Sequence, residues 1–309
     1  MRHVQEHATQ LSLVLGQHGV MGLDWIASAR DKDADETVQG HYNRQGLEEA
    51  ILAALAAAGK DIHHLKLEDL APVDEFHIRG SEATFELAAQ LKLNSNTKVL
   101  DVGCGIGGAS RYLVSQYGCH VTGLDLTDEY CRVAQSLSDR LGLASRVDYR
   151  QGSALDMPFE DSCFDVGWTQ HAAMNIADKP KLYSEIARVL RPDGYFAMYD
   201  VLAGPVSPLV YPVPWARDAS ISFLATPDNV HALLESTGLH ILSWHDTSEV
   251  GRVWFKESAT KLLQSGGSPT LGLQVLLGPD FRSMSQNLAR NLNENRIVLI
   301  ECVAQKLPV

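Results

Sequence analysis

Long hydrophobic runs are absent from this chain of 309 residues. The longest apolar stretches, 51–58 and 297–300, fall far short of the roughly 18 residues that a membrane-spanning helix requires. The first residues include charged and histidine side chains, and no apolar segment with a cleavage site follows, so we expect no secretory signal peptide. We therefore expect a cytoplasmic protein without a membrane partner.

A surplus of basic residues is also absent. The chain has 26 Lys and Arg residues against 38 Asp and Glu residues, which gives a formal net charge of −12. Nucleic acids and anionic surfaces attract clusters of Lys and Arg, so we expect no nucleic-acid partner. The hydrophobic fraction of 45% and the charged fraction of 21% fit an ordinary globular protein, and they leave a homo-oligomer open.

Paired cysteines are missing as well. The five cysteines are scattered, odd in number and contain no C-x-x-C pair, so neither a zinc site nor a disulfide framework is indicated. We expect reduced thiols and no metal site. These cysteines are Cys104, Cys119, Cys131, Cys163 and Cys302.

The most informative stretch is 98–108, KVLDVGCGIGG, because it joins a buried strand to a glycine-rich turn and a helix. Gly103, Gly105 and Gly107 let the backbone turn sharply and let a ligand approach the main chain closely. We therefore predict that a small molecule lies across this turn.

Strand and helix patterns alternate after this turn. Strand-like stretches occur at 120–126, 146–151, 163–170, within 182–202 and within 227–247, with helical patterns between them, and a last strand follows the helix predicted at 281–296. This spacing is typical of βαβ units, which form a parallel sheet with helices on both faces.

The flanking segments are less regular. Segment 37–59 predicts a short helix, an interruption at a glycine and a second helix, Pro72 predicts a break, and Ser81 is the expected N-cap of the next helix. We divide the chain into an extension over 1–36 and a domain over 37–309. Within that domain we expect N-terminal helices over 37–95, a ligand-binding core over 96–248, a cap insertion over 249–280 that contains Trp254 and Phe255, and a last helix and strand over 281–309.

The glycine turn is compatible with two kinds of nucleotide ligand. Gly103, Gly105 and Gly108 satisfy G-x-G-x-x-G, and Asp125 lies near the offset at which an acid binds a ribose, which fits a nicotinamide dinucleotide. However, Asp101 ends the strand directly before the turn, where its charge would repel a pyrophosphate. A cationic nucleoside is the better electrostatic match.

The blocks VLDVGCGIGG and GLDL, with the strands downstream, resemble the class I S-adenosylmethionine-dependent methyltransferases. The resemblance implies a Rossmann-like, doubly wound α/β sheet that is mostly parallel with an antiparallel last strand, N-terminal helices and a cap insertion. It also implies S-adenosylmethionine as cofactor and S-adenosylhomocysteine as product.

The same resemblance implies which residues bind the cofactor. The turn at 103–107 would bind the methionine moiety, Asp125 would accept hydrogen bonds from the ribose hydroxyls, and Leu126 would flank the adenine. Ser153 and Ala154 stand where many relatives have an aspartate. The predicted cofactor residues are Tyr42, His77, Asp101, Gly103, Cys104, Gly105, Gly107, Asp125, Leu126, Ser153, Ala154 and Gln170.

Further blocks, such as LEDLAPVDEFHIRG, WTQHAAMNIADK and YPVPWARD, resemble the sarcosine and dimethylglycine N-methyltransferases. This narrower resemblance implies that the methyl acceptor is the nitrogen of a small glycine-derived amine. Methylation of an oxygen or carbon on a phenolic, quinone or other natural-product acceptor is the alternative, since one core serves all these reactions. A protein that only binds the cofactor, or a nicotinamide oxidoreductase, is a more distant alternative.

Candidate chemical residues follow the strand at 163–170 and lie in the loop at 211–218. His171 is the predicted catalytic residue, because a histidine there can orient the acceptor or take a proton. Tyr211 and Trp215 could form an aromatic wall for a methylammonium group, with Arg217 pairing a carboxylate. The predicted acceptor residues are Trp168, Met174, Tyr211, Trp215 and Arg217.

Overall fold

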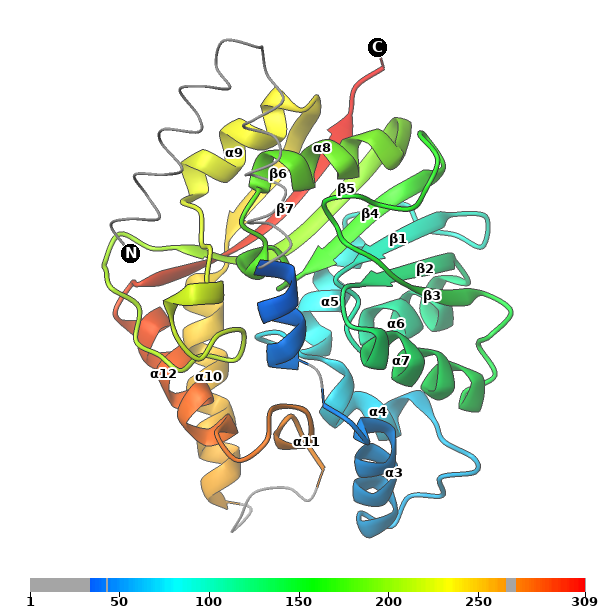
Figure 1. Ribbon diagram of the computed structural model, residues 1–309, viewed down its shortest axis with the longest axis vertical. Coiled ribbons are helices and arrows are strands. Elements are labelled where there is room, and N and C mark those ends of the chain that lie inside the picture. The colour runs from blue at the N-terminus through cyan, green and yellow to red at the C-terminus, as the bar shows by residue number, and fades with distance from the viewer. Residues whose placement is uncertain (1–33, 43, 265–270, 309) are drawn as a thin grey trace, which may run out of the picture.

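The chain folds around one seven-stranded sheet in the computed structural model, which describes residues 34–42, 44–264 and 271–308 (Figure 1). The strand order is β3-β2-β1-β4-β5-β7-β6. Neighbouring strands from β3 to β5 pair in parallel, and β7 runs antiparallel to both β5 and β6, so the predicted sheet is confirmed. The strands are β1 (Lys98–Val102), β2 (His120–Asp125), β3 (Val147–Gln151), β4 (Phe164–Gln170), β5 (Leu190–Ala203), β6 (Leu239–Asp246) and β7 (Ile297–Lys306).

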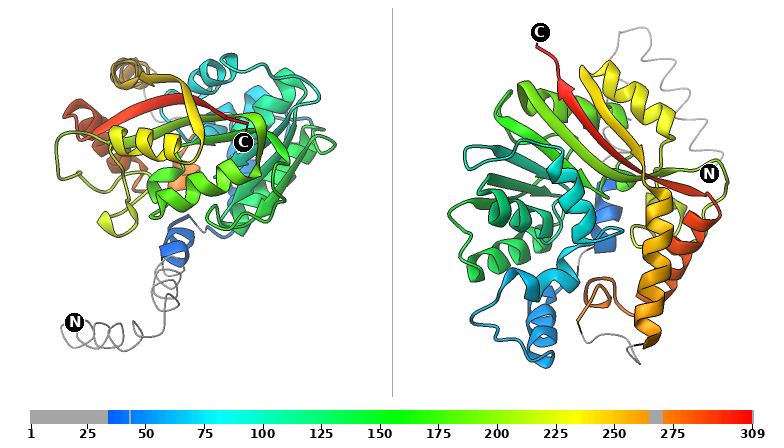
Figure 2. Two further views of the ribbon diagram at one scale, coloured as in Figure 1. Left: turned by 90° about the horizontal axis from the view of Figure 1, so that it is seen from above. Right: turned by 180° about the vertical axis from the view of Figure 1, so that it is seen from behind.

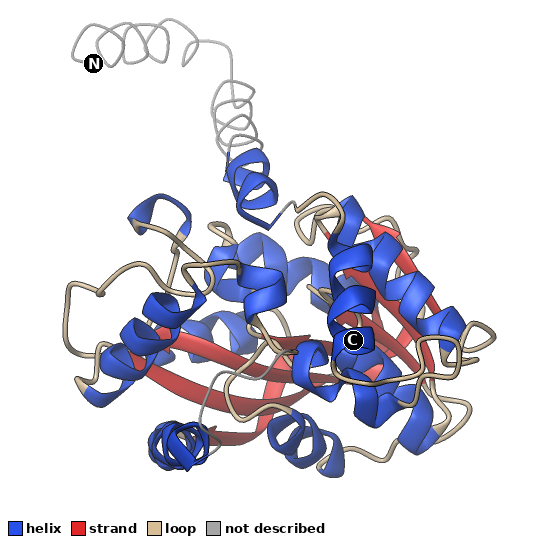
Figure 3. Ribbon diagram, turned by 90° about the horizontal axis from the view of Figure 1, so that it is seen from below, coloured by secondary structure: helices blue, strands red, loops and turns tan. Residues whose placement is uncertain are grey.

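Helices cover both faces of this sheet (Figure 3). Because side chains alternate along a strand, Val99 of β1 packs into the core below α5 and α6, whereas Leu100 and Val102 pack toward α8 and α9. The helices are α3 (Leu47–Ala57), α4 (Leu67–Asp74), α5 (Ser81–Ala89), α6 (Gly108–Tyr117), α7 (Asp128–Arg140), α8 (Lys179–Val189), α9 (Pro227–Ser236), α10 (Ser248–Gln264), α11 (Gln274–Leu277) and α12 (Phe281–Asn293).

The sheet order places a topological switch between β1 and β4. The chain leaves β1 toward β2 on one side, while β4 and β5 lie on the other side. Open α/β sheets bind ligands at the carboxyl ends of the strands beside such a switch. The glycine turn follows β1 at this edge, and His171 follows β4.

The predicted cap segment is mostly helical and stands beside the sheet. Helix α10 packs against α12 and β7, and Figure 2 shows α10 and α12 side by side at one end of the molecule. Within the described part of the chain, no helix combines the length and the apolar character needed to cross a membrane.

The N-terminal helices differ from the prediction in where they begin and end. A helix runs over 34–42 with Gly40 inside it, and the predicted interruption at a glycine comes at Gly46, which has a φ of 74° and directly precedes α3. The predicted boundary after residue 36 therefore falls inside a helix, while 1–33 lie outside the described residues. A mid-helix glycine costs only about 1 kcal/mol, which the side-chain contacts of this helix can offset.

Other local predictions were also wrong. Pro72 lies inside α4, where the burial of Leu70 and Val73 outweighs one missing backbone hydrogen bond. Gly80, with Ser81 as the first helical residue, is the N-cap of α5. Pro192 and Gly194, residue types that favour a turn before the fifth strand, lie instead within β5, which shifts register after Leu190.

Candidate functional site

The glycine turn after β1 is held tightly against β2. The amides of Gly103 and Cys104 both donate to the carbonyl of Leu124, over 2.8 and 3.2 Å. Gly103 has a φ of 74°, and a Cβ there would lie 2.4 Å from the Cβ of Ala172. This position therefore requires glycine for both its backbone conformation and its close approach to the loop after β4.

Asp125, at the end of β2, is fixed by two backbone donors. Its Oδ2 accepts a hydrogen bond from the Gly105 amide at 2.9 Å, and its Oδ1 accepts one from the Thr127 amide at 2.8 Å. Burial raises the pKa of Asp125, and these two amides act in the opposite direction. A carboxylate has about four lone-pair positions, so the group can still accept hydrogen bonds from a ligand.

A glycine-turn cavity opens in front of Asp125. It encloses about 780 Å³ of empty space with its open mouth included. Its walls combine apolar side chains with the exposed backbone of the turn. Predicted cofactor residues that line it are Tyr42, Gly103, Gly105, Asp125, Leu126, Ser153 and Ala154.

An acidic cavity lies on the other side of the glycine turn. It is lined by Asp101, Cys104, His77 and Gln170, together with the turn itself. Asp101 accepts a hydrogen bond from the Ser110 hydroxyl at 2.6 Å, and burial raises its pKa to about 7. A cationic ligand in this cavity would favour the ionised form of Asp101.

His77 and Gln170 belong to one polar network in the wall of the acidic cavity. The Nε2 atom of His77 lies 3.0 Å from the Gly80 carbonyl and 3.1 Å from the Thr84 hydroxyl, and the Gln170 amide lies 3.2 Å from it. Burial lowers the pKa of His77 to about 4, so the ring is neutral at pH 7. Gly107, in contrast, lines neither cavity and serves as the N-cap of α6 with a φ of 84°.

An aromatic cavity of about 620 Å³, mouth included, adjoins the other two. Among the described residues that line it, none is an Asp, Glu, Lys or Arg. Most of its wall comes from the loop at 214–215 and from α10 to α12. Its main lining residues are Phe76, Ile78, Met174, Pro214, Trp215, Trp254, Phe255, Leu273, Leu277, Phe281 and Leu288.

His171 stands where the three cavities meet. His171 and Phe76 line the glycine-turn, acidic and aromatic cavities alike. His171 has a φ of 48°, which is strained for a residue with a Cβ, and its amide donates to the Tyr199 carbonyl at 2.9 Å. Within the described residues its buried Nε2 atom has no hydrogen-bond partner, and burial holds its pKa well below the usual value. His171 thus presents a neutral imidazole with an unused nitrogen.

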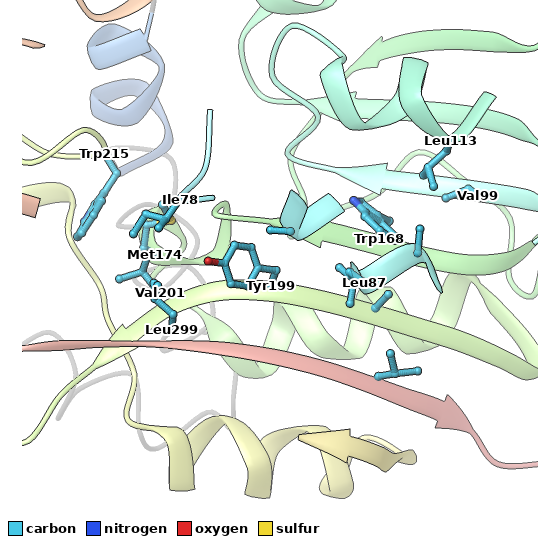
Figure 4. Packing of buried hydrophobic residues seen from close by; sticks show 14 of the residues in the cluster. Ile78, Leu87, Val99, Leu113, Trp168, Met174, Tyr199, Val201, Trp215 and Leu299 are labelled. Atoms are coloured by element: carbon cyan, nitrogen blue, oxygen red, sulfur yellow. The ribbon is translucent and has the colours of Figure 1, made fainter. Parts of the chain in front are cut away.

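The predicted acceptor residues separate into two groups. Met174 and Trp215 line the aromatic cavity. Trp168 does not: it is fully buried, its indole donates to Gln170 at 3.1 Å, and Figure 4 shows it beside Val99 and Leu113, far along the sheet from Trp215. The structure therefore contradicts an acceptor contact for Trp168.

Tyr211 and Arg217 also lie away from the aromatic cavity. Tyr211 packs against the core and lines none of the cavities described for residues 34–42, 44–264 and 271–308. Arg217 is 63% exposed and pairs with Asp280 at 2.6 Å. Tyr211 and Arg217 therefore form no part of the aromatic cavity, whose wall is completed by Trp254, Phe255 and Phe281 from later helices.

The helix over 34–42 closes the outer side of the glycine-turn cavity. Four of its side chains reach different loops: Asp35 accepts from Ser153, Gln39 donates to the Leu126 carbonyl, His41 lies 3.1 Å from the Pro214 carbonyl, and Tyr42 donates to Asn175. The Tyr42 bond measures 2.8 Å, and the Asn175 amide donates to the carbonyls of Trp215 and Ile221, each at 2.8 Å. Asn175 therefore joins this helix to the wall of the aromatic cavity.

Comparison with known proteins identifies the family. A family model described as "Methyltransferase domain" matches residues 100–198. An O-methyltransferase, cnsE, from Penicillium expansum is 30% identical over 223 residues, which cover 71% of this chain and 78% of that protein. The chain belongs to the class I S-adenosylmethionine-dependent methyltransferases. The nicotinamide alternative is therefore set aside.

Other relatives of this methyltransferase carry different descriptions. A glycine/sarcosine/dimethylglycine N-methyltransferase from Actinopolyspora halophila is 27% identical over 263 residues, which cover 84% of this chain but only 44% of the relative's length. The crystal structure of geranyl diphosphate C-methyltransferase from Streptomyces coelicolor A3(2), in complex with Mg²⁺, geranyl diphosphate and S-adenosylhomocysteine, shares the fold. Its TM-score is 0.58 at 15% identity, with 74% of this chain and 79% of that chain covered. The relatives of this chain thus include an N-methyltransferase and an O-methyltransferase, while the C-methyltransferase structure shows the shared fold alone. This chain is a methyltransferase of small molecules.

Several residues of the methyltransferase site escaped the sequence analysis. Asp35 lies in the acidic run DKDAD at 31–35, which is typical of a solvated break. Phe76 lies in the block LEDLAPVDEFHIRG, but neither it nor Phe281 was predicted as a site residue. Asn175 could have been noticed as a polar residue in the loop after β4, but its partners lie 40 to 133 positions away. Among the described residues no group of three or more His, Cys, Asp or Glu side chains is arranged to hold a metal ion.

Proposed function

We propose that the protein transfers a methyl group from S-adenosylmethionine to a small, largely apolar acceptor bound in the aromatic cavity. The observation that carries this proposal is that His171 and Phe76 line all three cavities. Two cavities suited to the cofactor and one suited to an acceptor thus meet at a single point, where a methyl group can pass between them.

The cofactor residues proposed here fit the chemistry of S-adenosylmethionine. Asp125 offers carboxylate lone pairs to the ribose hydroxyls, and Leu126, Ser153 and Ala154 line the space for the adenine. The acidic cavity, with Asp101, His77 and Gln170, suits the charged methionine end. S-adenosylmethionine would supply the electrophilic methyl group in this site.

The aromatic cavity favours an apolar acceptor over a glycine-derived amine. A carboxylate placed there would have no cation beside it, since Arg217 points elsewhere and pairs with Asp280. Burying an unpaired charge costs several kcal/mol. A phenolic, quinol or similar natural-product acceptor, methylated on oxygen or carbon, can instead place its ring against Phe76, Trp215 and Trp254.

His171 is the proposed catalytic group. Its neutral imidazole has an unused buried nitrogen that can accept a hydrogen bond from an acceptor hydroxyl and take its proton. The strained backbone of His171, anchored on Tyr199, keeps that nitrogen at the meeting point of the cavities. Met174 and Trp215 contribute apolar surface that orients the acceptor.

A glycine-derived amine is the second candidate, favoured by the likeness to the glycine/sarcosine/dimethylglycine N-methyltransferase. The aromatic walls could stabilise a methylammonium product by cation-π attraction. Such an acceptor needs no general base, because it reacts once its nitrogen is deprotonated.

The two candidates are separated by supplying labelled S-adenosylmethionine with phenols and quinols or with sarcosine and dimethylglycine. We expect label in a phenol or quinol, and we expect His171→Gln to lower kcat about 100-fold or more while S-adenosylhomocysteine still binds. Label in sarcosine or dimethylglycine alone, with His171→Gln fully active, would establish the amine reaction instead.

A further inference from the structure

A fourth space, which we name the arginine cavity, lies outside the aromatic cavity. It is formed by the helix over 34–42, the loop at 217–221 and the start of α12, and it encloses about 1160 Å³ with its open mouth included. Its lining includes charged side chains, unlike that of the aromatic cavity. Arg44 and Arg217 are the two arginines in its wall.

The arginine cavity adjoins the aromatic cavity along a shared wall. Tyr42 and Leu277 line both. In addition, His41 of the arginine cavity lies 3.1 Å from the carbonyl of Pro214, which lines the aromatic cavity. Tyr42 and Leu277 therefore stand between the two cavities, and a ligand longer than the aromatic cavity would have to pass these two side chains to reach the arginine cavity.

Of the two arginines in the wall of this cavity, Arg44 can bind an anionic ligand, because Arg217 already pairs with a carboxylate. Arg217 is neutralised by Asp280 at 2.6 Å, and Asp218 accepts the Ser220 amide at 2.8 Å as the cap of the turn at 219–221. Arg44 donates from Nη1 to the uncharged carbonyl of Val275 at 2.7 Å. Among the described residues no carboxylate pairs with Arg44, and four of its five N–H donors remain for a ligand.

Arg44 is exposed to solvent in the wall of the arginine cavity. Ile221, Leu276 and Met284 line the same cavity and offer an apolar surface beside the guanidinium. A planar guanidinium is suited to hold a carboxylate through two parallel hydrogen bonds. The positive charge of Arg44 also acts on buried Tyr130, where it opposes the rise in pKa caused by burial and by Asp125.

We propose that the acceptor is an elongated carboxylic acid, with its apolar, methyl-accepting part in the aromatic cavity and its carboxylate in the arginine cavity beside Arg44. This proposal rests on the proposed function, since it takes the aromatic cavity as the acceptor site. It assigns to Arg44 the carboxylate-binding role that the sequence had suggested for Arg217. In this arrangement the uncharged part of the acceptor lies at the site of methyl transfer, and its negative charge lies beside Arg44.

The test measures binding, because the natural acceptor is not needed for it. The probes are ω-phenylalkanoic acids of increasing chain length and their uncharged primary amides, titrated calorimetrically into the protein loaded with S-adenosylhomocysteine. We expect the acid to bind about fivefold more tightly than its amide once the chain spans the shared wall, with no preference for shorter chains. Arg44→Gln should remove this preference, and Arg44→Lys should retain part of it.

The matched control is Arg290→Gln, which removes an exposed guanidinium that pairs with Glu294 on the outside of α12. It should leave the preference for the acid unchanged. Equal binding of acid and amide at every length, or an unchanged preference in Arg44→Gln, would overturn the arginine subsite while leaving the aromatic cavity as acceptor site. If neither the acids nor the amides bind, the proposed function fails together with this inference.

Discussion

Replacing Tyr42 by Phe tests whether the helix over 34–42 controls cofactor binding. The change removes one hydroxyl, which donates to the Asn175 Oδ1 atom at 2.8 Å, and leaves the ring in place. A hydrogen bond of this kind contributes about 0.5–1.5 kcal/mol. If that bond holds the helix over the glycine-turn cavity, its loss lowers the population of the closed form, and the affinity for S-adenosylhomocysteine falls by up to about tenfold.

Asn175→Leu provides the comparison, because it removes the same bond together with two others. The carbonyls of Trp215 and Ile221 then lose their donor inside the protein, at about 1–3 kcal/mol each. We expect the free energy of unfolding to fall by about 2–5 kcal/mol in this variant and much less in Tyr42→Phe.

Calorimetry with S-adenosylhomocysteine gives the affinity, and urea unfolding gives the stability. Tyr195→Phe is the matched control, since the Tyr195 hydroxyl has no hydrogen bond within the described residues and should change neither quantity. An unaltered affinity for S-adenosylhomocysteine in Tyr42→Phe would refute the claim that the Tyr42 hydrogen bond controls cofactor binding. The contacts of the helix over 34–42 would then serve only the stability of the fold.

Two further predictions concern the cofactor side of the site. Asp101 has its pKa raised by burial to about 7, so the folded protein keeps a proton that the unfolded chain releases near 3.8. The Asp101 carboxyl therefore lowers the free energy of unfolding as pH rises between those values. A cationic cofactor favours the ionised form of Asp101, so it should bind more tightly as pH rises from about 6 to 8. Calorimetry across this range should show a weaker rise in Asp101→Asn; an identical pH profile would contradict the assignment. Gly103→Ala should abolish S-adenosylhomocysteine binding and destabilise the fold by about 2–4 kcal/mol, because its Cβ would lie 2.4 Å from Ala172 at a φ of 74°. Gly142→Ala, at a φ of 73° with no atom within 4 Å of the new Cβ, measures the cost of placing an alanine at positive φ without a steric clash. An equal fall in the free energy of unfolding in the two variants would show that the clash with Ala172 is unimportant.

The sheet and the glycine turn could be predicted because their signals are local. Apolar runs at βαβ spacing and glycines at fixed offsets from a strand depend on neighbouring residues only. The helix over 34–42 was misplaced for the same reason. Asp35 belongs to the acidic run DKDAD at 31–35, whose composition is typical of a solvated break, yet an acidic residue such as Asp35 is favourable in the first turn of a helix.

The acceptor side depends on contacts between distant parts of the chain. Arg217 looked free because its partner, Asp280, lies 63 positions later. Trp168 looked available because it is near the end of β4, but it shares a side of that strand with Gln170 and is covered by the core. Motifs within one segment do not carry this information.

The glycine-turn cavity and the aromatic cavity come mainly from different parts of the chain, which affects how methyltransferases of this kind can change their acceptors. The glycine-turn cavity is built mainly from residues up to 176 and the aromatic cavity mainly from residues after 213, with Tyr42, Phe76 and His171 in common. A new range of acceptors can therefore arise, in nature or by design, mainly through changes in the C-terminal third of the chain. The residues up to 176 that form the glycine-turn cavity could stay unchanged in such variants.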